Sequence, residues 1–205
     1  MSYFELATLK TVIFGAGKAA PDLEKWLHAP DASGTLLGAW TSDIGSLNEI
    51  YLLRSFDDVD ALMRERERTH RSANPFGCLD HLVSYAQESY RKLDFIGEVE
   101  PGAYGPFYEI RTYVMKPNGL VPTMEKWQAA LPKREEYSPC TIAMYGIDGF
   151  PRLTQIWPYE SLEARGNARG QSVAEGNWPP KGGPDWLTPD MSSTIAMPMA
   201  FSPLK

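Results

Sequence analysis

Several features that mark common protein classes are scarce in this chain of 205 residues. It has only two cysteines, too few for a disulfide scaffold, so we expect a reducing compartment and a cytoplasmic location. No apolar run approaches the roughly 20 residues that span a bilayer, and the N-terminus shows no secretion signal. The 20 Lys and Arg are outnumbered by 26 Asp and Glu and form no basic stripe. We therefore expect neither nucleic acid nor a membrane as a partner.

The composition is otherwise that of a globular protein. Hydrophobic residues make up 43% of the chain and charged residues 22%, which predicts a buried core rather than a disordered tail. Seventeen glycines and seventeen prolines predict many loops. The length suits one large domain or two small ones.

Six short segments of the first half recur in the same order in the second half. One such match would be chance, but six in order indicate a duplicated module of about 100 residues. We therefore predict two domains, residues 1–98 and 106–205. The matched segments are 4–6 with 108–110, 23–26 with 124–127, 37–40 with 142–145, 49–51 with 155–157, 56–61 with 159–164, and 93–95 with 199–201.

Both halves predict the same order of elements. Each opens with an alternating strand, which is followed by a Gly- or Pro-containing loop and a helix, with Asp22 as the expected N-cap in the first half. A hairpin and a charged helix come next, and a variable Pro/Gly-rich segment leads to a last strand ending at Phe95 or Phe201. This β-α-β-β-α-β order is that of a ferredoxin-like module.

A single ferredoxin-like module leaves one face of its sheet without helices. Two copies in one chain can cover these faces by stacking one sheet on the other. We therefore predict an α+β fold in which two tandem ferredoxin-like repeats pack sheet to sheet as an α/β barrel. The seam is expected near residues 97–105, which are rich in Gly, Pro and Glu.

Five segments of the second half carry a family resemblance. They are the strand 108–113, the helix element 125–127, the hairpin exit 156–161, the following 164–169, and the ending 198–204. Together they resemble the NIPSNAP family of the dimeric α/β-barrel superfamily. The match is good over residues 108–204 and weaker over 3–96, where Ala7 stands in place of Arg111 and Leu52 or Leu53 in place of the tryptophan.

The resemblance implies the tandem ferredoxin-like fold and no particular reaction. Related families on this fold include cofactor-free monooxygenases, haem-degrading enzymes, lactone isomerases and ligand-sensing domains, so the fold does not determine the function. By analogy with the superfamily, we expect a homodimer or larger homo-oligomer.

Strand alternation places Glu109, Arg111 and Tyr113 on one face. If that face looks into the barrel, the charges are partly desolvated and must be paired. One interpretation is a site for an anion or carbonyl, with Arg111 as a fork and Tyr113 as a hydrogen-bond donor. The other interpretation is an ion pair that sets strand register. Glu5 is the counterpart of Glu109 in the first half and has no neighbouring arginine, so we expect an asymmetric site.

Two further groups of side chains in the second half are candidates for the same site. Arg165 and Arg169 are four residues apart on the second helix, so they share a face that could bind an anion or simply be solvated. Four aromatic residues are most simply core and could also wall an apolar ligand pocket. They are Trp127, Tyr145, Trp157 and Tyr159.

Two other patterns are weaker. The loop from Gly15 to Ala20 follows a strand and precedes a helix, as a dinucleotide-binding loop does, with Asp43 at a suitable distance to bind a ribose. Ala20 replaces the third glycine of that motif, and the sequence predicts no parallel βαβ units. We therefore do not expect a dinucleotide, and only phosphate binding by the Gly15–Gly17 loop remains an open possibility. Cys78 and His81 form a lone C-x-x-H pattern without further convergent ligands. We expect no metal and no cofactor.

These observations predict a NIPSNAP-like protein that binds a small, partly apolar, anionic or carbonyl-bearing molecule in a pocket of the second repeat. The first alternative is a cofactor-independent monooxygenase or isomerase, with Tyr113, Glu109 or His81 handling a proton. The second alternative is a structural or adaptor protein that acts through oligomerisation.

Overall fold

The computed structural model describes residues 2–205, which form eight strands and four α-helices. The chain divides into two compact units. Unit 1 contains residues 2–90, 100–103 and 196–205, and unit 2 contains residues 91–99 and 104–195.

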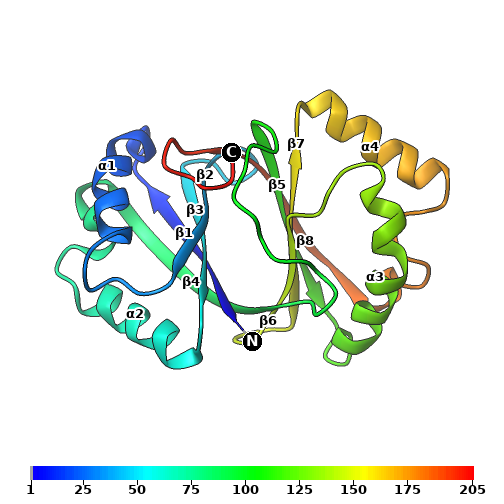
Figure 1. Cartoon of the computed structure of the whole chain (residues 1–205), viewed down its shortest axis with the longest axis horizontal. Coiled ribbons are helices and arrows are strands. Elements are labelled where there is room, and N and C mark those ends of the chain that lie inside the picture. The colour runs from blue at the N-terminus through cyan, green and yellow to red at the C-terminus, as the bar shows by residue number, and fades with distance from the viewer. Residues whose placement is uncertain (1) are drawn as a thin grey trace. The chain divides into compact units, whose positions relative to one another are not determined.

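Unit 1 is built on an antiparallel sheet in the order β2-β3-β1-β4. Helices α1 and α2 both lie on one face of this sheet (Figure 1). Its elements are β1 (Tyr3–Thr11), α1 (Gly15–Leu27), β2 (Thr35–Ile44), β3 (Glu49–Phe56), α2 (Val59–Arg71) and β4 (Leu82–Lys92).

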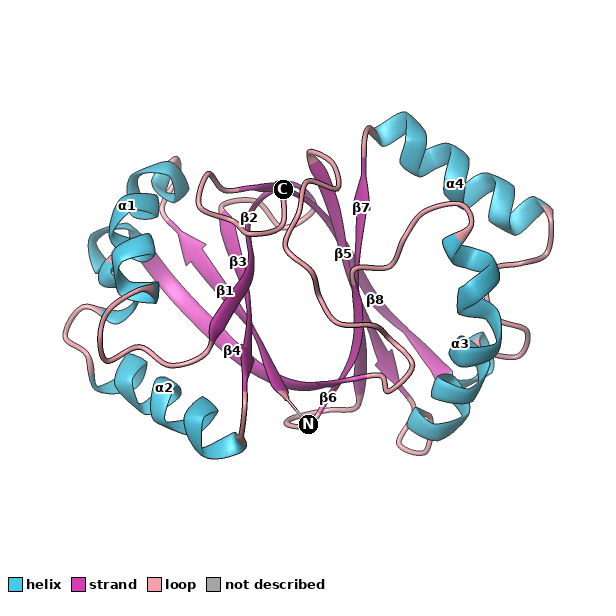
Figure 2. Cartoon of the chain, viewed as in Figure 1, coloured by secondary structure: helices cyan, strands magenta, loops and turns pink. Residues whose placement is uncertain are grey.

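Unit 2 repeats this arrangement, with the strand order β6-β7-β5-β8. Helices α3 and α4 lie on one face of the sheet (Figure 2). Its elements are β5 (Phe107–Met115), α3 (Leu120–Glu135), β6 (Ile142–Gly146), β7 (Arg152–Tyr159), α4 (Leu162–Ala174) and β8 (Leu187–Pro198).

These orders confirm the predicted fold class: an α+β protein with two tandem ferredoxin-like repeats. The first two strands of each repeat are separated by a helix and do not pair with each other directly, as the split βαβ arrangement requires. Because β1 pairs antiparallel with both of its neighbours, the loop after it does not belong to a parallel dinucleotide-binding sheet. The packing of one sheet on the other stays a prediction.

Each unit is completed by a segment that follows the last strand of the other repeat. Leu93 follows β4, yet its amide donates to the carbonyl of Ala143 in unit 2 at 2.9 Å. Met199 follows β8, and its amide donates to the carbonyl of Ala39 in unit 1 at 2.9 Å. Both side chains are buried in the receiving core. This exchange was not predicted from the sequence. Phe95 and Phe201, which were predicted to end the last strands, both lie after them.

The burial pattern corrects the alignment of the first helices. Gly15, Ala19, Leu23 and Leu27 are buried in α1, and the buried set of α3 includes Thr123, Trp127 and Leu131. An offset of 104 residues superimposes these two series, and the first strands share it because Glu5 and Glu109 occupy the same place. Trp127 therefore corresponds to Leu23, and its predicted match with Trp26 was wrong by three residues.

The other first-repeat assignments need two further corrections. Asp22 lies inside α1, which begins at Gly15, so it is not the N-cap and instead pairs with Lys25 at 2.9 Å. Glu5 lies opposite Arg54 in the sheet, as Glu109 lies opposite Trp157. Arg54, rather than a leucine or Tyr51, is therefore the counterpart of Trp157.

Candidate functional site

A buried carboxylate organises the charged side chains of unit 2. Glu109 in β5 is fully buried, and its Oε1 atom accepts hydrogen bonds from Arg111 at 2.5 Å, Arg165 at 2.5 Å and Ser193 at 2.7 Å. Its Oε2 atom is buried and accepts no hydrogen bond within residues 2–205. Arg169 lies 3.8 Å from that second oxygen.

The arginines hold Glu109 in its charged form. Burial alone would raise the pKa of its carboxyl, because desolvation penalises the charge. The hydrogen bond from Arg165 and the charge of Arg111 outweigh burial and lower the pKa to about 2. Glu109 is therefore a permanent counter-ion at neutral pH and a weak base.

Three arginines face this single carboxylate. Within the described chain, no other Asp or Glu lies within 4.0 Å of the guanidinium of Arg111, Arg165 or Arg169. The cluster thus carries an excess of two positive charges. Burial, followed by the repulsion from Arg111, lowers the pKa of Arg169, so an additional anion would stabilise its charge.

Arg111 also connects Glu109 to Tyr113. The Nε–H of Arg111 donates to the Tyr113 hydroxyl at 2.6 Å, and its guanidinium carbon lies 5.2 Å from the centre of that ring. Burial alone would lower the pKa of Arg111, but its contacts with Tyr113 and Glu109 raise it. The hydroxyl of Tyr113 is an acceptor in this bond and keeps its own proton for another partner.

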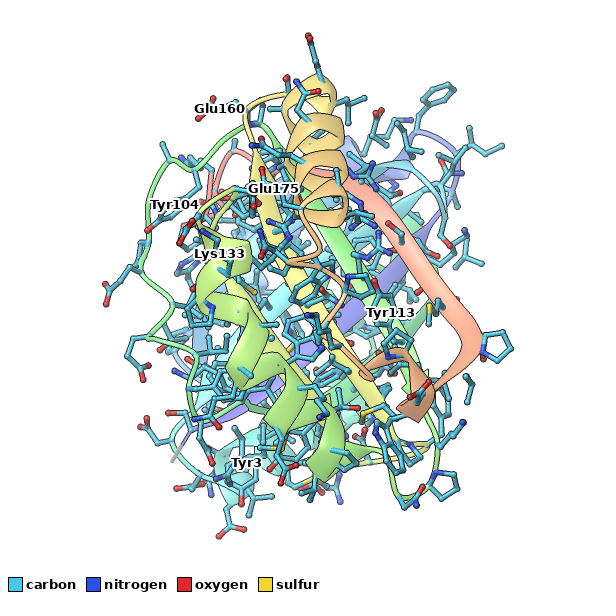
Figure 3. All side chains as sticks on the ribbon, turned by 90° about the vertical axis from the view of Figure 1, so that its right-hand side faces the viewer. Tyr3, Tyr104, Tyr113, Lys133, Glu160 and Glu175 are labelled. Atoms are coloured by element: carbon cyan, nitrogen blue, oxygen red, sulfur yellow. The ribbon has the colours of Figure 1, made fainter. Side chains whose placement is uncertain are left out.

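A cavity of about 250 Å³ lies beside this cluster. Tyr113 of β5 and Arg169 of α4 line it, and Figure 3 labels Tyr113 in this part of unit 2. The rest of the lining is mainly apolar and comes from α3, α4, β8 and the proline-rich segment before β8. These residues are Thr123, Trp127, Val173, Trp178, Pro179, Pro180, Gly183, Pro184, Leu187 and Met191.

The structure brings most of the candidate residues to one side of the unit 2 sheet. Because Arg165 of α4 contacts Glu109, the strand face that carries Glu109, Arg111 and Tyr113 looks toward the helices. The condition raised for this face, that it looks into a barrel, is therefore not met. Helix α4 packs over this face and brings Arg165 and Arg169 to the same carboxylate.

The candidate aromatic residues divide between the cavity and the core. Trp127 is buried and lines the cavity, where its ring meets that of Trp178 edge to face at 4.9 Å between centroids. Trp157 and Tyr159 are buried in the core, and Tyr145 packs against it. None of these last three residues is part of the cavity lining.

The most buried polar residue of the cavity lining, Thr123, was not among the predicted site residues. Thr123 is only 1% exposed, and its hydroxyl has no hydrogen-bond partner in the described chain. Two further residues were not predicted: Ser193, which donates a hydrogen bond to Glu109, and Trp178, whose ring packs against that of Trp127. A threonine in a helix and a serine in a strand give no sequence signal of a site.

The remaining candidates lie elsewhere. Gly15 begins α1, and Asp43 lies exposed near the end of β2. Both Cys78 and His81 belong to unit 1, and burial raises the pKa of the Cys78 thiol to about 11. No three His, Cys, Asp or Glu side chains between residues 2 and 205 gather as metal ligands. No helix in the same range is long and apolar enough to cross a membrane.

Solved structures with the same arrangement extend over nearly the whole chain. A structure described as an anthrone oxidase-like protein has a TM-score of 0.71 at 12% identity and covers 98% of this chain and 93% of its own. A proposed monooxygenase from Lactobacillus acidophilus has a TM-score of 0.68 at 13% identity, with coverages of 96% and 93%. At these identities the likeness establishes the class, a tandem ferredoxin-like fold, and nothing about activity.

Sequence comparison identifies the family. The NIPSNAP family model matches residues 4–89 and 108–203, so both repeats are included. The chain belongs to the NIPSNAP family, as the resemblance in the second repeat predicted. A NIPSNAP family protein of unknown function from Agrobacterium tumefaciens is 22% identical, with a TM-score of 0.45, and covers 50% of this chain and 96% of its own. No curated protein matches the chain. Oligomeric state, partners and compartment stay predictions.

Proposed function

We propose that unit 2 binds a small, partly apolar molecule that carries a carboxylate or a carbonyl group. The observation that carries this proposal is a pair of hydrogen-bond donors on one cavity. The guanidinium of Arg169 donates no hydrogen bond within residues 2–205, and the hydroxyl of Tyr113 has an unused proton. Both line the cavity, so an acceptor placed there would satisfy both.

The rest of the cavity suits an apolar body of limited size. Its volume of about 250 Å³ lies just below the usual range for small-molecule sites, roughly 300–1,000 Å³. Trp127, Trp178 and three prolines form much of its wall. The two indole rings are flat and the proline rings add rigid apolar surface, so this wall favours a planar ring in the ligand. A carboxylic acid with one or two fused rings fits both the volume and the donors.

Calorimetric titration with 2-naphthoate tests the proposal. We expect saturable one-to-one binding to the full-length protein, and Arg169→Gln should weaken it by about tenfold to a hundredfold, the usual loss for a hydrogen bond to a charged group. The matched control is Arg64→Gln, which makes the same charge change at an exposed position of unit 1. Absence of binding, or an equal effect of both variants, would contradict the proposal.

A cofactor-independent oxygenase or isomerase is the second candidate, and the position of Tyr113 favours it. Tyr113 is the only one of the three predicted proton-handling residues in the cavity lining. The low pKa of Glu109 makes it a weak base, and His81 belongs to unit 1. Aerobic incubation with ring-hydroxylated acids, followed by mass spectrometry, tests for turnover. A product that wild type forms and Tyr113→Phe does not form would support this candidate.

A further inference from the structure

The hydroxyl of Thr123 is an unexplained polar group in the cavity wall. The side chain is 1% exposed, lines the cavity, and has no hydrogen-bond partner among the described residues. A threonine in a helix usually bonds a backbone carbonyl one turn earlier, but this hydroxyl does not. A buried hydroxyl without a partner destabilises a fold, so this one calls for an explanation.

The first repeat shows that the fold does not need this hydroxyl. With the offset of 104 residues, Thr123 corresponds to Ala19, which is fully buried in the apolar core of unit 1. An apolar residue at this helix position therefore packs well in the same architecture. The hydroxyl of Thr123 therefore points to a role that unit 1 does not have. Thr123 lines the cavity of unit 2, so a ligand in this cavity is the partner to consider.

The cavity thus has polar anchors on three elements. Arg169 of α4 and Tyr113 of β5 form the first anchor, Thr123 of α3 forms the second, and Trp127 and Trp178 also line the cavity. Two excess positive charges at the first anchor favour an acid over a neutral carbonyl compound. The second anchor is uncharged and can donate or accept a single hydrogen bond.

We infer that the ligand is a planar carboxylic acid with a second hydrogen-bonding group, a hydroxyl or a carbonyl on its ring system, and that Thr123 recognises this second group. The inference rests on the proposed function, since it takes the cavity of unit 2 as the binding site.

The experiment compares 2-naphthoate with its 5-, 6- and 7-hydroxy derivatives on the full-length protein. At least one hydroxy acid should bind wild type about threefold to tenfold more tightly than 2-naphthoate, the gain typical of a neutral hydrogen bond. In Thr123→Val, which keeps the shape and removes the hydroxyl, the ratio of the two dissociation constants should fall to about one. Thr35→Val, at an exposed position of β2, is the matched control and should keep the wild-type ratio.

The outcomes separate the two proposals. If the acids bind but no hydroxy derivative gains affinity in wild type, or if the gain persists in Thr123→Val, the inference is overturned and the proposed function stands. If none of the acids binds wild type, both fall. Thr123→Ala copies the residue of the first repeat and provides a second variant should the valine protein not fold. The same loss of the ratio in Thr123→Ala would support the inference.

Discussion

The two units use the same buried glutamate in different ways. In unit 1, both oxygens of Glu5 are used: Oε1 accepts from Arg54 at 2.5 Å, and Oε2 accepts from Arg66 at 3.1 Å and Gln87 at 3.2 Å. In unit 2, Glu109 concentrates its contacts on Oε1 and leaves Oε2 without a donor in the described chain. Both oxygens of Glu5 therefore have hydrogen-bond donors, whereas Glu109 has one oxygen without a donor and three arginines around it.

The difference follows from substitutions at equivalent positions. Arg54 of unit 1 also donates a hydrogen bond to Glu65 at 2.7 Å. In unit 2 the position of Arg54 is taken by Trp157, and that of Glu65 by Ala168. The N-caps Asp58 and Ser161 align α2 with α4 and make Arg66 the counterpart of Arg169. The first repeat thus neutralises its arginines with two carboxylates, whereas the second has one.

The cavity of unit 2 occupies positions that are core in unit 1. Offset by 104 residues, four buried apolar side chains of unit 1 correspond to an arginine, a tyrosine, a threonine and a tryptophan. The pairs are Ala7 with Arg111, Leu9 with Tyr113, Ala19 with Thr123, and Leu23 with Trp127. Three of these unit 2 residues line the cavity. These positions are apolar core in unit 1, whereas in unit 2 part of them line a mainly apolar cavity that also has polar side chains.

Removing each glutamate's charge is the strongest test of this comparison. Glu5→Gln should lower the free energy of unfolding by about 5 kcal/mol, because Arg54 is only 2% exposed and would lose a charged partner inside the protein. Glu109→Gln should cost less, about 3 kcal/mol, because Arg111, Arg165 and Arg169 are 14%, 28% and 34% exposed and can reach water. Urea unfolding at pH 7 measures both.

The exposed Glu163→Gln on α4 is the control and should leave the unfolding midpoint unchanged. A loss for Glu109→Gln that equals or exceeds the loss for Glu5→Gln would show that the two clusters do not differ in the way the contacts indicate.

Acid should release the stabilisation by Glu109. Its pKa is about 2 in the folded protein against an ordinary value of 4.5. A carboxyl with a lowered folded pKa stabilises fully above its unfolded pKa and loses this contribution as the pH falls toward the folded value. Between pH 4.5 and 2 the protein should therefore lose about 3 kcal/mol through this group.

Glu109→Gln cannot lose this contribution, so its urea midpoint should depend less on pH over the same range than that of wild type. Parallel pH profiles for the two proteins would show that Glu109 does not carry the shift. The comparison should be made at constant ionic strength, since salt screens the partly exposed arginines.

The fold could be predicted because strand alternation and internal repetition are visible in the sequence. The register within the repeat was harder, and the α1–α3 alignment shows why. The resemblance of residues 23–26 to 124–127 includes Glu24 and Lys25, which are exposed and under no packing constraint. The buried series from Gly15 to Leu27 determines the true alignment, but burial is known only from the structure.

The site was predictable in its parts and not in its assembly. Alternation grouped Glu109 with Arg111 and Tyr113, and helical spacing grouped Arg165 with Arg169. That both groups meet at one carboxylate depends on how α4 packs on the sheet. The cavity also needs residues 178–187, which the sequence identifies only as a variable loop.

The smallest expected effect concerns the ligand-free protein. If Thr123 keeps an unsatisfied hydroxyl for a ligand, Thr123→Val should raise the free energy of unfolding by about 1 kcal/mol, because it removes the cost of burying that group at nearly constant volume. Thr112→Val is the contrasting variant: its hydroxyl bonds Thr154 at 2.8 Å, so its loss should destabilise. Urea unfolding without ligand measures both changes. A destabilised Thr123→Val would contradict this expectation. It would show that the hydroxyl of Thr123 has a stabilising partner in solution even without a ligand.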